Sequence, residues 1–188
     1  MGRKEEMFQY AREKLTPYIS ERANLLRKDC AAYLEMKREY HRIVSDLLQT
    51  AQKRQAAGTL GQIHYFSIFY LQSSAVTQSY DFALSLTNER YCLDQNGLLC
   101  FWCPQRLFQA VEEDLSFFEK DARQMWIRIR PYELEEIRRA YINNLYQLAG
   151  FFFGEESLDA AALGGIARLD CCDEVRFSFG GYMDQTIQ

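Results

Sequence analysis

The chain has 188 residues, of which 48% are hydrophobic and 14% aromatic, and its formal net charge is −4. This length and apolar content suffice for a folded core and exclude intrinsic disorder over most of the chain. No segment reaches the roughly 20 apolar residues that cross a bilayer, and the charged amino terminus lacks the apolar core of a secretory signal, so we expect a cytoplasmic protein with no membrane contact.

The first predicted element is a long helix. From Pro17 to about Ala57 the sequence has no glycine or internal proline and repeats apolar residues at heptad spacing, as in a coiled coil. We therefore predict an N-terminal helical arm over residues 1–57, formed by one long helix or a helical hairpin. This arm would self-associate as a dimer, or bind a protein partner, through the residues of one heptad position, Leu26, Tyr33, Tyr40 and Leu47.

The arm is also mildly basic. Residues 1–56 hold 12 Lys and Arg against 8 Asp and Glu, whereas the rest of the chain is acidic. A basic arm can bind an acidic protein or the phosphates of a nucleic acid, although such charges are most often an ordinary solvated helix face. The sequence contains no recognised nucleic-acid-binding motif, which leaves this class as an alternative.

An antiparallel meander should follow the glycines at 58 and 61, which end the helix. Residues 63–71 are apolar on both sides and predict a central strand, and residues 80–87 alternate apolar and polar side chains as a half-buried strand does. Residues 91–93 and 98–102 predict a hairpin around Asn96-Gly97, because this pair favours a tight turn.

The remaining elements predict an α+β fold with helices packed on a small antiparallel sheet. Apolar stripes at helical spacing predict helices from Pro104 to about Ala122 and from Tyr132 to Gly154. A brief strand over 125–130, a short helix before Gly164 and a last strand over 175–179 are expected around them. We assign residues 58–188 to an α+β body that forms one continuous domain with the arm.

Two cysteines are the main candidates for chemistry. Cys100 and Cys103 precede Pro104, and a thiol at the start of a helix gains nucleophilicity when its pKa is lowered. The competing interpretation is that both pack in the core as small apolar residues. A zinc site that joins them to Cys171 and Cys172 lacks a second CxxC pair.

The sequence contains none of the common phosphate-binding, dinucleotide-binding, hydrolase or metalloprotease motifs. We assign no catalytic, cofactor-binding or metal-binding residue, and we expect a non-enzymatic interaction or scaffolding module that acts through the long helix. The alternatives are a nucleic-acid-binding accessory protein and a small-ligand or thiol-dependent enzyme at Cys100 and Cys103.

Overall fold

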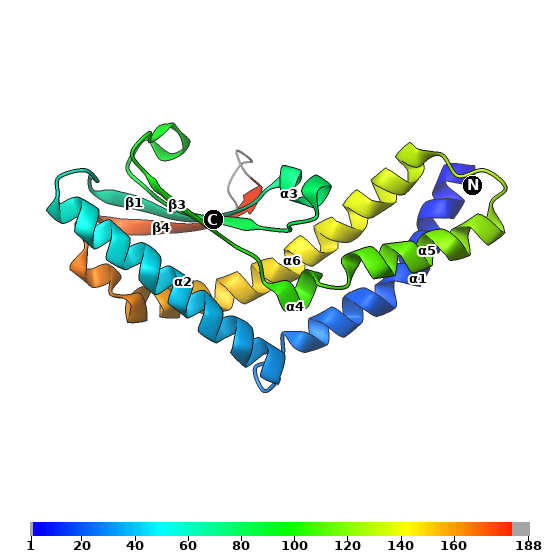
Figure 1. Cartoon of the computed structure of the whole chain (residues 1–188), viewed down its shortest axis with the longest axis horizontal. Coiled ribbons are helices and arrows are strands. Elements are labelled where there is room, and N and C mark those ends of the chain that lie inside the picture. Colours follow the sequence, from blue (N-terminus) through cyan, green and yellow to red (C-terminus); the bar gives the residue numbers. More distant parts are fainter. Residues whose placement is uncertain (1, 182–188) are drawn as a thin grey trace. The chain divides into compact units, whose positions relative to one another are not determined.

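A computed structural model describes residues 2–181 of the chain (Figure 1). Contacts within the chain define two units: unit 1 comprises residues 1–33 and 105–149, and unit 2 comprises residues 34–104 and 150–188. The predicted α+β class is confirmed. The unit boundaries differ from the predicted division into residues 1–57 and 58–188, because the chain passes between the two units three times.

Unit 1 is helical. It contains α1 (Arg3–Leu25), α4 (Gln105–Phe108), α5 (Val111–Met125) and the first part of α6 (Pro131–Gly164). The apolar stripes of these helices meet in a core that includes Leu15, Phe118 and Ile137, each at most 4% exposed. Pro131 is the first residue of α6, a position where the missing N–H of proline costs no hydrogen bond.

Of the two predicted forms of the arm, the single continuous helix from Pro17 to Ala57 is wrong, because the helix is interrupted. Helix α1 ends at Leu25, and five residues separate it from α2 (Ala31–Ala56). In the turn between them, the backbone N–H of Leu26 donates to the carbonyl of Ala23 over 3.1 Å. The Arg27 guanidinium donates to the Asp29 carboxylate over 3.0 Å. The heptad spacing crosses this turn unchanged, so the spacing alone does not reveal the break.

Unit 2 contains a four-stranded sheet in the order β3-β2-β1-β4. The strands are β1 (Ile63–Tyr70), β2 (Phe82–Thr87), β3 (Leu98–Trp102) and β4 (Cys171–Gly181). The pairs β1–β2 and β2–β3 are antiparallel, whereas β4 lies parallel to β1. The predicted antiparallel meander is therefore confirmed for β1, β2 and β3, and the parallel strand β4 makes the sheet mixed.

One face of the sheet is covered by α2 and the second part of α6. The ring of Phe153 on α6 lies 5.0 Å from that of Phe82 on β2, and the ring of Tyr40 on α2 lies 5.4 Å from that of Trp102 on β3. Helix α6 continues through Gly154 to Gly164, so the predicted end at Gly154 is wrong. This extension supplies the aromatic side chains that close the core of unit 2.

The other face of the sheet carries the connection between β2 and β3, residues 88–97, which rises away from α2 (Figure 1). It contains the short 3-10 helix η1 (Tyr91–Leu93), so residues 91–93 are not the hairpin strand that was predicted. Two other short elements, α3 (Gln72–Thr77) and η2 (Ile166–Arg168), complete the assignment, and residues 126–130 form no strand. Among the described residues, no helix combines the length and the apolarity needed to cross a bilayer.

Candidate functional site

Three of the four residues predicted to form an interface lie inside the protein. Tyr33, Tyr40 and Leu47 are 3%, 0% and 5% exposed, and Leu26 is half-buried where α1 ends. The Tyr40 hydroxyl lies 2.8 Å from Ser157 Oγ, within unit 2. Tyr33, Tyr40 and Leu47 therefore pack against the chain itself.

The pKa values of the two candidate thiols are raised, whereas a nucleophilic thiol requires a lowered pKa. Burial raises the pKa of the Cys100 thiol to about 11 and that of the Cys103 thiol to about 12, with Asp46 and Asp81 adding smaller effects in the same direction. The helix that follows Cys103 is only four residues long. Within residues 2–181, no group of three or more His, Cys, Asp or Glu side chains is arranged to hold a metal ion.

Several positive charges of α1, which belongs to the predicted basic arm, are paired with acidic side chains of unit 1. The Arg3 guanidinium lies 2.8 Å from Glu133, the Lys4 ammonium 2.7 Å from Glu136, and the Lys14 ammonium 2.9 Å from Asp121. These pairs reduce the positive charge that α1 presents to a polyanion such as a nucleic acid.

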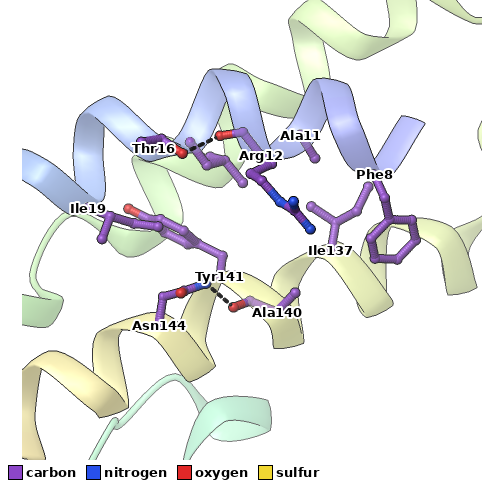
Figure 2. Close-up of a pocket in the computed structure, with 10 residues that line it drawn as sticks. Phe8, Ala11, Arg12, Thr16, Ile19, Ile137, Ala140, Tyr141 and Asn144 are labelled. Carbon is purple, nitrogen blue, oxygen red and sulfur yellow. Dashed lines mark hydrogen bonds between the residues drawn. The ribbon is translucent and has the colours of Figure 1, made fainter. Parts of the chain in front are cut away.

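A groove of about 510 Å³ runs between α1 and α6 in unit 1 (Figure 2). Its floor is apolar and formed by side chains that are buried in the unit, namely Ala11, Leu15, Ile137 and Tyr141. Half-buried Phe8 and Ile19 lie at the two ends of the α1 wall. The exposed rim residues on α6 include the small side chain of Ala140, which leaves the groove open to solvent.

The polar groups of the groove are of two kinds. The Thr16 hydroxyl donates to the Arg12 carbonyl over 2.6 Å, and the Asn144 side-chain amide donates to the Ala140 carbonyl over 2.8 Å, so both are occupied within their own helices. The Arg12 guanidinium extends from α1 toward α6 (Figure 2) and has no ion-pair or hydrogen-bond partner among the described residues. The groove therefore has an apolar floor and one available positive charge.

A buried charged cluster holds the helices that form this groove. Arg22 of α1, Asp114 of α5 and Tyr141 of α6 are 6%, 5% and 2% exposed. The Asp114 carboxylate accepts a hydrogen bond from the Arg22 guanidinium and another, 2.6 Å long, from the Tyr141 hydroxyl. Burial raises the pKa of Asp114, although Tyr141 and Arg22 oppose that effect. These hydrogen bonds fix the position of the Tyr141 side chain in the floor of the groove.

Sequence reasoning missed this groove because it is defined by two helices that are distant in the chain. The signal on α1 is the spacing of Phe8, Ala11, Leu15 and Ile19, which repeats every three or four residues and marks one helical face. On its own, such a face indicates a core contact. Comparison of the chain with protein-family models, with curated proteins and with solved structures finds no match.

Proposed function

We propose that unit 1 is a protein-interaction module that binds an amphipathic helix of a partner protein in the groove between α1 and α6. The observation that carries this proposal is the combination of the apolar floor with the available guanidinium of Arg12. It keeps the predicted class of function, a non-enzymatic interaction module, and moves the contact surface from the predicted heptad residues to the groove in unit 1.

The dimensions of the groove suit a helix. Its wall on α1 extends over the twelve residues from Phe8 to Ile19, or about 16 Å for eleven rises of 1.5 Å. That length matches about three turns of a bound helix, which would place its apolar anchors at positions i, i+3 or i+4, and i+7. The small side chains of Ala140 and Thr16 at the rim allow such a helix to approach closely.

The positive charge of Arg12 indicates that the partner helix carries an acidic residue. An apolar peptide that covers Arg12 without pairing it would leave a desolvated guanidinium, which is costly. The partner helix is therefore expected to carry an Asp or Glu beside its apolar stripe, because a carboxylate matches the geometry of a guanidinium.

Site-specific photo-crosslinking in cells that naturally produce the protein tests the proposal. A photoreactive residue is placed at Ala140 in the groove or, as a matched control, at Ser116, an exposed position on α5. Crosslinked peptides are sequenced by mass spectrometry. We expect the Ala140 position to capture one amphipathic segment with an acidic residue, and Ser116 not to capture it.

Charge reversal gives the second part of the test. Arg12→Glu should weaken binding of a synthetic peptide of the captured segment by about tenfold or more, and replacing the acidic residue of the peptide by Lys should restore it. Equal crosslinking at both positions, or no effect of Arg12→Glu, would overturn the proposal. A crosslink to another copy of this chain would replace the partner by self-association, which light scattering across a concentration series would detect.

A further inference from the structure

A second cavity lies in unit 2, on the face of the sheet opposite α2. It has a volume of about 200 Å³, and its walls come from β1, β2, β3 and the 88–97 connection. Aromatic and aliphatic side chains predominate among its larger lining residues, which include Phe69, Tyr91, Leu98 and Leu99. The volume is comparable to the roughly 150 Å³ of an apolar protein cavity that admits benzene.

Two buried hydroxyl groups in this lining are unsatisfied. Neither Thr87 Oγ1 nor the Tyr91 hydroxyl has a hydrogen-bond partner within residues 2–181, although both atoms are shielded from solvent. A buried polar group without a partner lowers stability, and folded proteins contain few of them. Two such groups in the lining of one cavity are available to pair with a polar group of a bound molecule.

The backbone at Tyr91 is strained in a way that keeps its side chain over the sheet. Its φ is 53°, a left-handed conformation that is uncommon for a bulky residue. The Tyr91 ring packs on the rings of Tyr65 and Phe69 with centroid distances of 4.8 and 6.1 Å. Thr87 is the cross-strand neighbour of Tyr65, so both unsatisfied hydroxyls belong to side chains that flank the same aromatic residue.

The connection that carries Tyr91 is held in place by its own hydrogen bonds. The Asp94 carboxylate accepts from the backbone N–H groups of Asn88 and Asn96, each over 2.9 Å. Gly97 lies so close to β2 that a Cβ atom there would be 2.9 Å from Thr87 Cγ2. The cavity is therefore bounded by a fixed turn, and a ligand would find its walls already in position.

The chemistry of the lining selects among ligands. Among the described lining residues, the one charged side chain is that of Asp94, and its carboxylate already accepts two N–H groups. An anion would be repelled by Asp94, whereas the Phe69 and Tyr91 rings and the two hydroxyls favour a flat apolar body with a hydrogen-bonding group. We propose that this cavity binds a small neutral aromatic molecule that carries a hydroxyl or ring N–H group, with Thr87 and Tyr91 as its hydrogen-bond partners.

Nuclear magnetic resonance titration of the full chain with four probes of similar size tests this inference. The probes are p-cresol, toluene, benzoate and benzylamine, and the amide signals of Thr87, Gly97 and Leu99 report binding in the cavity. We expect p-cresol to bind most tightly, because toluene lacks the hydroxyl and benzoate carries a negative charge. Binding that shifts only signals of α1 and α6, preference for a charged probe, or no shift with any probe would overturn the inference.

Two conservative variants test whether each hydroxyl forms a hydrogen bond to the ligand. Tyr91→Phe and Thr87→Val each remove one hydroxyl with little change in shape and should weaken p-cresol binding by up to about tenfold, while toluene binding stays within about twofold. Tyr132→Phe, which removes an exposed tyrosine hydroxyl in unit 1, is the matched control and should change neither. An unchanged ratio of p-cresol to toluene affinity in both cavity variants would show that the hydroxyls are not the ligand's partners. If a variant does not fold, the order of the four probes on the unmodified protein still decides the question.

Discussion

Removing one member of the buried Arg22–Asp114–Tyr141 cluster should destabilise unit 1 more than replacing all three residues together. In Arg22→Met the Asp114 carboxylate keeps only the Tyr141 hydroxyl as a partner, and in Asp114→Leu the guanidinium of Arg22 keeps only its 3.1 Å hydrogen bond to the Tyr18 carbonyl. Each single variant therefore leaves a charged group buried and poorly compensated.

The expected magnitude follows from the burial of the cluster. Arg22 and Asp114 are at most 6% exposed, and breaking an ion pair with this degree of burial typically costs about 3–5 kcal/mol. The triple variant Arg22→Met, Asp114→Leu, Tyr141→Phe removes both charges and the hydroxyl donor at once. Its free energy of unfolding should lie within about 1 kcal/mol of that of the parent or exceed it, because apolar residues of similar volume avoid the cost of desolvating two charges.

Urea unfolding followed by tryptophan fluorescence measures this difference within unit 1. The chain has two tryptophans, and in a Trp102→Phe background the remaining one, Trp126, lies beside Tyr10 of α1 with ring centroids 5.0 Å apart. Its emission therefore reports the packing of α1 on the segment that follows α5. Midpoints and slopes are compared for the parent, the single variants and the triple variant in this background.

If both single variants lose less than about 1 kcal/mol of unfolding free energy, the reasoning is refuted, because a loss of that size is typical of a solvated surface pair. A triple variant as unstable as the worst single variant would also contradict it. In that case the three side chains would contribute mainly through packing that the substitutes do not reproduce.

Three further predictions concern separate groups. Tyr91→Phe and Thr87→Val should each stabilise the ligand-free protein by about 1 kcal/mol in urea unfolding, since each removes a buried hydroxyl that has no partner within residues 2–181; a loss of stability would show that the hydroxyls are satisfied. Burial raises the pKa of the Cys103 thiol to about 12, so its alkylation rate should rise about tenfold per pH unit from pH 7 to pH 10. The rate is measured by mass spectrometry of samples quenched at successive times, and a plateau below pH 9 would contradict this prediction. The pKa of the Glu133 carboxyl is lowered, chiefly by the backbone N–H of Arg130, so its contribution to stability is complete above its ordinary pKa of 4.5 and is lost as the pH falls through the lowered pKa. Glu133→Gln should therefore reduce the loss of unfolding free energy per pH unit at acidic pH. An unchanged loss would argue against the interaction.

Local patterns in the sequence predicted several of the regular elements. The alternation at residues 80–87 corresponds to β2, and the helical stripe through Ile137, Tyr141 and Leu145 lies on α6, where all three residues are buried. These elements follow from side-chain periodicity within one segment, which the sequence displays directly. The same reasoning failed at residues 26–30, since a turn can preserve heptad spacing while it redirects the chain.

The sheet arrangement and both candidate sites depend on contacts between distant segments. Ile63 of β1 pairs with Cys171 of β4, and no local pattern near either residue indicates a parallel partner. The groove depends on α1 lying beside α6, and the cavity depends on Tyr91 adopting a φ of 53° over β1. The sequence also does not report burial, which raises the pKa of the Cys103 thiol, whereas the thiol hypothesis requires a lowered pKa.

The parallel pairing of β4 with β1 has a consequence for the synthesis of the protein. Strand β1 is complete at Tyr70, but β4, its neighbour on one side, is complete only at Gly181. During translation, more than a hundred residues are therefore added while one edge of the apolar segment IHYFSIFY has no partner strand. Unpaired edges of this composition promote association between nascent chains, so the yield of folded protein should depend on how quickly the last residues emerge and on chaperones that shield β1 until then.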